Sequence, residues 1–122
     1  GSGRIMVVDD EELVLRTARE VLEKSGYEVL TFIRGEEALQ YFHKKEEPVD
    51  VVILDLIMPD IDGLDCFRKM KHIDPLATII LSTGYVTEAY AREVLEEGAS
   101  GFLPKPYTAT ALSQAVQAAM ER

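Results

Sequence analysis

The chain has 122 residues, of which 47% are hydrophobic, and this suits one compact domain with a single core. Its 13 Lys and Arg residues face 22 Asp and Glu residues, and the formal net charge of −9 argues against direct binding to nucleic acid. No apolar run approaches the roughly 20 residues that cross a bilayer, and there is no secretory signal, so we expect no membrane insertion.

Short apolar runs alternate along the chain with longer stretches in which hydrophobic residues recur at helical spacing. The apolar runs predict five buried strands, at residues 5–8, 29–32, 49–54, 78–81 and 100–103. The longer stretches predict five helices, at about residues 13–24, 35–45, 64–72, 87–97 and 108–120. Gly26 and Gly98 supply helix stops, and Thr87 is predicted to cap the fourth helix.

This regular alternation of strand and helix predicts a mainly parallel sheet with helices on both faces. In such open sheets, ligands bind at the carboxyl ends of the strands. Four of the predicted strands are followed by groups that can react or bind, namely Asp9-Asp10, Asp55, Thr83 and Lys105. We therefore expect one functional site at this edge of the sheet.

Adjacent carboxylates at Asp9 and Asp10 repel each other, and a third carboxylate at Asp55 adds to the repulsion. A hard divalent cation such as Mg²⁺ would relieve it, because Mg²⁺ prefers oxygen ligands and commonly binds one or two carboxylates together with a phosphate. In the alternative interpretation, Asp10 caps the following helix and Asp9 is a surface residue. The two interpretations do not exclude each other.

With a cation nearby, the carboxylate of Asp55 can act as a nucleophile toward phosphorus. Lys105 would supply a point charge for a phosphate or a carboxylate, and the following Pro106 raises the chance of a cis bond. The Thr83 hydroxyl could donate to a phosphoryl oxygen. Ser82 is its nearest competitor for that role.

Together these residues resemble the receiver domain of two-component response regulators, and the resemblance runs from residue 4 to about residue 121. The matching motifs are Asp9-Asp10, Asp55 with Met58-Pro59 and Gly63, Thr83, residues 98–102, and Lys105-Pro106. The resemblance implies a doubly wound, flavodoxin-like (βα)5 α/β fold with a five-stranded parallel sheet in the order 2-1-3-4-5. We expect a single domain at residues 4–122 without an output domain, preceded by an expression-tag remnant at residues 1–3.

The same resemblance implies a function. Asp55 would accept a phosphoryl group from the phosphohistidine of a histidine kinase or a histidine phosphotransfer domain. Asp9, Asp10, Asp55 and the backbone carbonyl of Ile57 would hold Mg²⁺, and Lys105 would pair with Asp55 and then with the phosphoryl oxygen. The domain would be a signalling phosphoacceptor that catalyses its own phosphorylation and dephosphorylation, without being an enzyme that acts on other substrates.

The resemblance further implies a switch. Thr83 would move toward the phosphoryl group and Phe102 would turn inward, which would bias the surface formed by the fourth helix, fifth strand and fifth helix. An output domain or a second copy of the chain would bind there. A static core position is the alternative for Phe102.

Two positions depart from the usual family pattern. Ile57 and Tyr85 lie two residues after Asp55 and Thr83, where family side chains flank the path of the attacking water. Their bulk predicts slow self-dephosphorylation. The Gly84-Tyr85 stretch looks most like receivers attached to hybrid sensor histidine kinases, while a stand-alone or DNA-binding regulator stays open.

Other interpretations remain at this point. Residues 60–63 (Asp-Ile-Asp-Gly) mimic the nucleophile loop of haloacid-dehalogenase-like phosphatases, although that loop should leave a strand directly. A pseudo-receiver that binds proteins without being phosphorylated is the second alternative. His43 and His72 are interpreted as surface histidines, and the single Cys66 fits a reducing, cytoplasmic setting.

Overall fold

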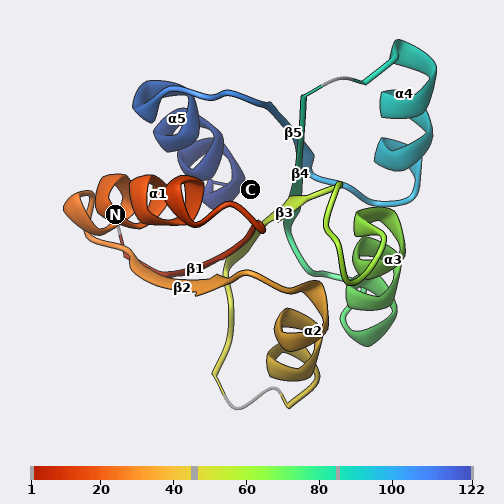
Figure 1. Cartoon of the computed structure of the whole chain (residues 1–122), viewed down its shortest axis with the longest axis horizontal. Coiled ribbons are helices and arrows are strands. Elements are labelled where there is room, and N and C mark those ends of the chain that lie inside the picture. Colours follow the sequence, from red (N-terminus) through yellow and green to blue (C-terminus); the bar gives the residue numbers. More distant parts are fainter. Residues whose placement is uncertain (1, 45–46, 85, 122) are drawn as a thin grey trace.

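Five strands and five helices alternate in the computed structural model, which describes residues 2–44, 47–84 and 86–121 (Figure 1). The strands are β1 (Arg4–Val8), β2 (Glu28–Phe32), β3 (Val51–Asp55), β4 (Ile79–Thr83) and β5 (Gly101–Pro104). The helices are α1 (Glu12–Lys24), α2 (Gly35–Lys44), α3 (Gly63–Ile73), α4 (Glu88–Glu96) and α5 (Ala109–Met120). The predicted order of elements is confirmed.

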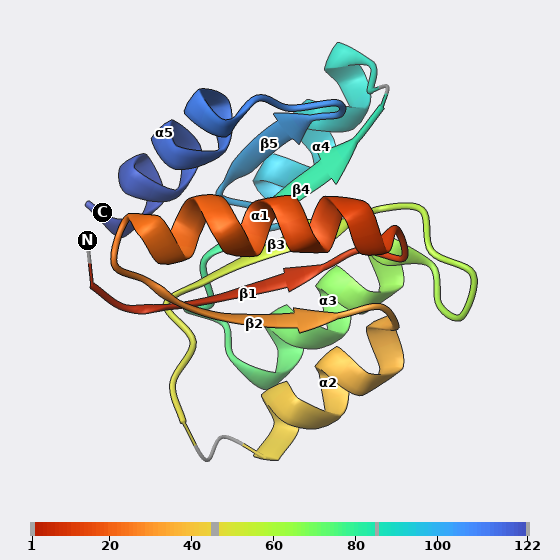
Figure 2. The same ribbon diagram turned by 60° about the vertical axis from the view of Figure 1, so that its left-hand side comes forward.

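The strands form one parallel sheet in the order β2-β1-β3-β4-β5, as expected for a doubly wound flavodoxin-like fold. Helices cover both faces of the sheet (Figure 2). α1 and α5 pack on one face over a core that includes Ile53 and Leu103. α2, α3 and α4 pack on the other face over a core that includes Leu54 and Leu81. Buried strands therefore divide their side chains between two cores, which is why they read as continuous apolar runs.

Two strands extend further toward the functional edge than predicted. β3 begins at Val51 instead of residue 49 and includes Asp55, and β4 includes Thr83. Asp55 lies opposite Ser82 in the ladder between β3 and β4. Asp55, Ser82 and Thr83 are therefore residues of the strands and not of the loops, because the pairing of β3 with β4 continues past the last apolar residue of each strand.

Three of the helices have an N-cap side chain that accepts hydrogen bonds from the first turn. Asp62, Thr87 and Thr108 accept hydrogen bonds from backbone N–H groups in the first turns of α3, α4 and α5, so the predicted cap at Thr87 is confirmed. The suggestion that Asp10 caps α1 is wrong, because Glu11 is the N-cap residue and its side chain makes no capping bond. Asp9 instead accepts a hydrogen bond of 2.9 Å from the Glu11 N–H.

Within the described residues, none of the helices combines the length and the apolar character that crossing a bilayer requires. The longest, α1, has 13 residues.

Candidate functional site

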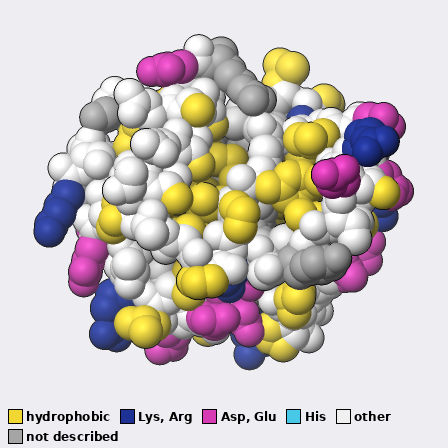
Figure 3. Space-filling model, turned by 90° about the horizontal axis from the view of Figure 1, so that it is seen from above, with side chains coloured by type: hydrophobic (Ala, Val, Ile, Leu, Met, Phe, Trp, Pro, Cys, Tyr) yellow, Lys and Arg dark blue, Asp and Glu magenta, His cyan; other side chains and the backbone are white. Residues whose placement is uncertain are grey.

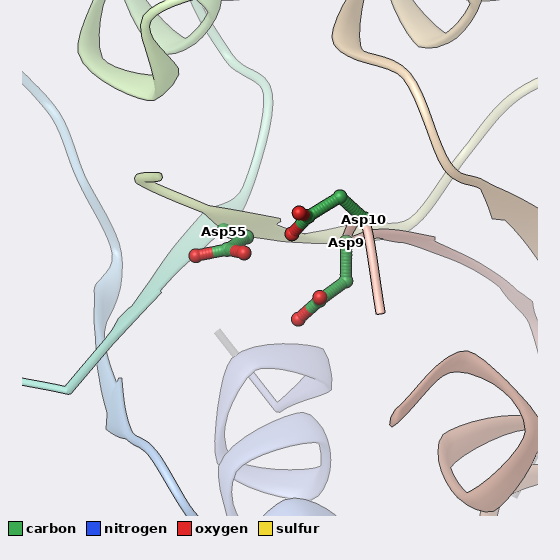
Figure 4. Close-up of side chains that lie close together, drawn as sticks. All are labelled: Asp9, Asp10 and Asp55. Atoms are coloured by element: carbon green, nitrogen blue, oxygen red, sulfur yellow. The ribbon is translucent and has the colours of Figure 1, made fainter. Parts of the chain in front are cut away.

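Three carboxylates meet at the carboxyl edge of the sheet (Figure 4). Asp9 and Asp10 follow β1, and Asp55 ends the neighbouring strand β3. One carboxylate oxygen from each lies within 4.8 Å of the others. Asp9 and Asp55 are 2% and 4% exposed, whereas Asp10 is open to solvent. The cluster therefore presents hard oxygen donors at the surface of an otherwise buried site.

Lys105 joins this cluster from the loop after β5. Its Nζ lies 2.9 Å from Asp9 Oδ2, 3.5 Å from Asp55 Oδ2 and 3.5 Å from Glu11 Oε1. The bond between Lys105 and Pro106 is cis. The structure thus brings together the strand ends of β1, β3 and β5, as the parallel sheet predicts.

Opposing effects act on the pKa of Asp55. Burial raises the pKa of Asp55 from 3.8 to about 6, and the nearby charge of Asp9 acts in the same direction. The hydrogen bond of 3.1 Å from the Ile57 N–H to Asp55 Oδ1 and the charge of Lys105 lower this pKa, but only in part. One lysine therefore does not fully compensate the buried carboxylates.

The pKa of Lys105 is raised as well, but by charge and hydrogen bonding instead of burial. Burial by itself would lower the pKa of Lys105, but its hydrogen bond to Asp9 and the charges of Asp9, Asp55 and Glu11 raise that pKa above its ordinary value. The ammonium group consequently stays protonated at neutral pH and can meet an anionic group.

The loop between β3 and α3 is folded tightly onto the end of β3. Gly63 donates a hydrogen bond of 3.1 Å to the Leu56 carbonyl. A Cβ at Gly63 would lie 2.3 Å from the Leu56 Cα and 2.6 Å from the Asp55 carbonyl oxygen, so only glycine fits this close approach of two backbone segments. This packing places Ile57 beside the acidic cluster.

Asp60 and Asp62 in this loop bind backbone. Asp60 accepts hydrogen bonds of 3.2 and 3.0 Å from the N–H groups of Gly35 and Glu36 at the start of α2. Asp62 accepts bonds of 2.8 and 3.3 Å at the start of α3. The dehalogenase-like interpretation is wrong, because both of its acids serve as helix caps instead of a nucleophile and its acid partner.

Thr83 and Phe102 lie on the other side of the sheet from Asp55. Side chains alternate along a strand, and Leu81, the residue two before Thr83, belongs to the core under α2, α3 and α4. Phe102 packs against that same core and is half-buried. Thr83 is buried and lines a hollow with Ile57 and others, so it borders the acidic cluster from the opposite face.

The side chain of Ser82 points to the opposite face of the sheet from that of Thr83. Ser82 lies two residues after Ile80, which belongs to the core under α1 and α5, so Ser82 shares a face with Asp55. Its hydroxyl is buried without a hydrogen-bond partner among the described residues. The two neighbouring hydroxyls are thus in distinct environments.

A cavity of about 620 Å³ opens over the acidic cluster. Leu13 and Tyr107 line it, as do Asp55 and Ile57. Ile57 is 74% exposed, and burial raises the pKa of Tyr107 to about 12, with the charge of Asp9 as a further cause. Leu13 and Glu11 were not expected here from the sequence, and only their position within three residues of Asp10 could have indicated them. Tyr85, named in the hydrolysis hypothesis, lies outside the described residues.

Known proteins match this chain along almost its whole length. The family model described as response regulator receiver domain matches residues 5–117. The sensor kinase CckA of Brucella abortus is 32% identical over 122 residues, which cover all of this chain and 13% of that protein. The chemotaxis protein CheY of Thermotoga maritima is 31% identical over 114 residues, which cover 93% of each chain. The chain therefore spans most of CheY but a small part of CckA.

Solved structures of receiver domains are similar to this fold. A response regulator receiver domain protein from Clostridium thermocellum has a TM-score of 0.89 and 38% identity, covering 98% of this chain and 95% of that one. The receiver domain from the hybrid histidine kinase CckA has a TM-score of 0.80 and 35% identity, covering 97% and 99%. With its parallel sheet and acidic strand ends, this chain belongs to the family of response regulator receiver domains, the phosphoacceptor modules of two-component signalling.

Proposed function

We propose that Asp55 is the residue that accepts the phosphoryl group, from the phosphohistidine of a histidine kinase or of a histidine phosphotransfer domain. One observation carries this assignment. Asp55 is a buried carboxylate that lies 3.5 Å from Lys105 Nζ and clusters with Asp9 and Asp10, and the cavity gives a donor access to it. Among the three clustered acids, Asp55 alone lies in a strand of the sheet.

The transfer needs few groups. An oxygen of Asp55 would attack the phosphorus as the bond between phosphorus and the histidine nitrogen breaks, and the bonding electrons would return to the imidazole. Lys105 would move its contact from Asp55 to a phosphoryl oxygen, since its Nζ already lies 3.5 Å from Asp55 Oδ2. In this sense the domain would catalyse its own phosphorylation. In dephosphorylation a water oxygen would attack the phosphorus, the bond from phosphorus to the Asp55 oxygen would break, and inorganic phosphate would leave the restored carboxylate.

The acidic cluster suits Mg²⁺. Its three carboxylates supply the oxygen donors that Mg²⁺ prefers, and Lys105 is the cation that the described residues place against them. Asp9, Asp10, Asp55 and the backbone carbonyl of Ile57 are the proposed protein ligands. When bound, the cation would neutralise charge on the transferring phosphoryl group.

Thr83 and Phe102 are the proposed switch. Phosphorylation adds roughly −1.5 to −2 charges and three acceptor oxygens beside Thr83. Since Thr83 and Phe102 share one face of the sheet, a shift of Thr83 toward the site would make room next to Phe102. Figure 3 shows hydrophobic side chains gathered between α4 and α5, with charged groups mostly at the margin. This α4-β5-α5 surface is the proposed contact for an output domain or a second copy.

The setting of the domain is also a proposal. Similarity to both CckA and CheY is compatible with a receiver in a hybrid histidine kinase and with a stand-alone regulator. In either case the domain would be cytoplasmic and would occupy residues 4–122, with residues 1–3 as a tag remnant. It would make no direct contact with nucleic acid.

The test is intact-mass measurement after incubation with acetyl phosphate and Mg²⁺. One phosphoryl adduct is expected on the wild type, none on Asp55→Asn, and the full adduct on Asp65→Asn, a matched acid-to-amide change at an exposed site on α3. Omission of Mg²⁺ should abolish the adduct. If the folded protein takes up no phosphoryl group, even from histidine kinases, the pseudo-receiver interpretation is correct instead.

The decay of the adduct tests the lifetime hypothesis. Ile57 is exposed at the mouth of the cavity, where its side chain can hinder an attacking water. Ile57→Asn should therefore shorten the lifetime of the phosphorylated state. An unchanged decay rate in this variant and in a small polar replacement of Tyr85 would contradict the hypothesis.

A further inference from the structure

A groove of about 710 Å³ runs between α2 and α3, on the face of the sheet opposite α1 and α5. These two helices lie side by side in both ribbon views (Figures 1 and 2). The groove has apolar and basic lining residues. They include Leu39, His43, Lys44, Lys69, His72 and Ile73.

The charge of this groove contrasts with that of the whole chain. The chain carries a formal net charge of −9 and contains two histidines, and both of them line the groove. Three of its basic residues do so as well, against a single acid, Glu36. A local excess of positive charge on an acidic protein marks a surface that attracts anionic partners.

Two of these basic side chains have no partner of their own in the described part of the chain. Arg68 forms a two-pronged contact with Glu97, with bonds of 2.7 and 3.0 Å, so its charge is already matched. Lys44 and Lys69 form no ion pair with any described residue, and both are exposed. Each can therefore meet an acid on another molecule without first breaking a contact.

The shape of the groove matches a helix. Lining residues recur along α2 at positions 36, 39–40 and 43–44, and along α3 at 68–69 and 72–73, which is one stripe on each helix. The apolar members of these stripes, Leu39 and Ile73, are half-buried, and the lysines are exposed. This arrangement fits an amphipathic helix with apolar residues on one face and acids beside them.

We propose that the α2–α3 groove binds an acidic amphipathic helix of a partner protein. None of its lining residues belongs to the phosphoacceptor site or to the α4-β5-α5 surface, so the groove is a third contact surface of the domain. The helix would place leucine-like side chains against Leu39 and Ile73, and its acids would reach Lys44 and Lys69.

The probe is a synthetic helical peptide of about four turns (~15 residues), with leucines on one face and glutamates elsewhere. The control peptide carries lysine in place of each glutamate. Backbone amide NMR of the folded domain would report binding by residue. We expect the acidic peptide to shift resonances of α2 and α3, and its affinity to fall as salt rises. The lysine peptide should leave those resonances in place.

A charge-reversed pair tests the assignment. Lys44→Glu combined with Lys69→Glu should weaken binding by about tenfold or more, which corresponds to about 1.4 kcal/mol. Arg16→Glu combined with Lys24→Glu changes the net charge equally on the exposed side of α1 and should bind as the wild type does. Circular dichroism would show that both variants fold.

Several outcomes would overturn the proposal. These are equal binding of both peptides, shifts outside α2 and α3, equal weakening by the two double variants, or no binding at millimolar peptide. Concentration-dependent self-association that disappears in the Lys44 and Lys69 variant would identify a second copy as the occupant instead.

Discussion

Asp55 is a buried carboxylate, and burial disfavours its ionised form. Its pKa is raised from 3.8 to about 6, chiefly by burial, so between these values the folded protein holds a proton that the unfolded chain has lost. Folding stability from this group is therefore lost as pH rises through about 6. The site accepts this cost because a deprotonated, poorly solvated carboxylate is the form that can react.

The first prediction concerns this cost. In the absence of divalent metal, Asp55→Asn should raise the free energy of unfolding by about 1–3 kcal/mol at neutral pH, since one pKa unit corresponds to about 1.4 kcal/mol. The gain should shrink toward about pH 4. Urea unfolding with a chelator present, at several pH values, measures it. A less stable variant at neutral pH would show that the contact with Lys105 outweighs burial.

The second prediction separates two adjacent hydroxyls. Ser82→Ala removes a buried hydroxyl that has no described partner, and should be neutral or stabilising by up to about 1 kcal/mol with acceptor activity retained. Thr83→Ala should still accept the phosphoryl group but fail to change the α4-β5-α5 surface. Amide NMR of both variants, before and after phosphorylation, distinguishes them. Loss of the surface change in Ser82→Ala alone would reverse the two roles.

At the scale of elements, the loop from β3 to α3 holds the site together. It carries Ile57, it caps α2 through Asp60 and α3 through Asp62, and it closes on Gly63. A single short segment therefore sets the positions of the acidic cluster and of two helices.

The third prediction tests this closure. Gly63→Ala should destabilise the domain by about 2–4 kcal/mol, because its Cβ would meet backbone atoms of Leu56 and Asp55 that cannot move independently of β3. Gly101→Ala is the control, since a Cβ there meets nothing within 4 Å. Thermal unfolding compares the two. Similar melting temperatures would mean that the loop can shift without loss.

The elements themselves were accessible from the sequence, because buried parallel strands are continuous apolar runs and their helices are amphipathic. The sequence did not indicate to which face of the sheet each polar side chain points, or which distant segments those side chains contact. Alternation puts Ser82 and Thr83 on opposite faces, but only the register with β3 shows that Ser82 is the one that shares a face with Asp55. Likewise, Asp60 was visible as an acid in a turn, but its contacts with Gly35 and Glu36 join segments 25 residues apart.

On the scale of the whole molecule, excess negative charge gathers at one edge of the sheet. Because three carboxylates face one lysine there, a cation that binds the folded state but not the unfolded chain must stabilise the fold.

The fourth prediction follows from this linkage. Mg²⁺ should raise the melting temperature of the wild type, with a stabilisation of about 1.4 kcal/mol at a concentration tenfold above its dissociation constant. Asp9→Asn should lose most of the effect. Sodium chloride at equal ionic strength is the control for general screening. An equal gain from both salts would show that the cluster does not bind the cation specifically.

The two-sided arrangement of the sheet has one more consequence. Asp9, Asp55 and Lys105 lie toward α1 and α5, whereas Thr83 and Phe102 lie toward the helices of the opposite face. Ile57 borders both sides, because it lines the cavity over the acidic cluster and the hollow beside Thr83. Substitutions on α4 that suit a new binding partner can therefore accumulate while Asp9, Asp55 and Lys105 stay unchanged. Specificity and timing can evolve separately in such a domain, and can be engineered separately.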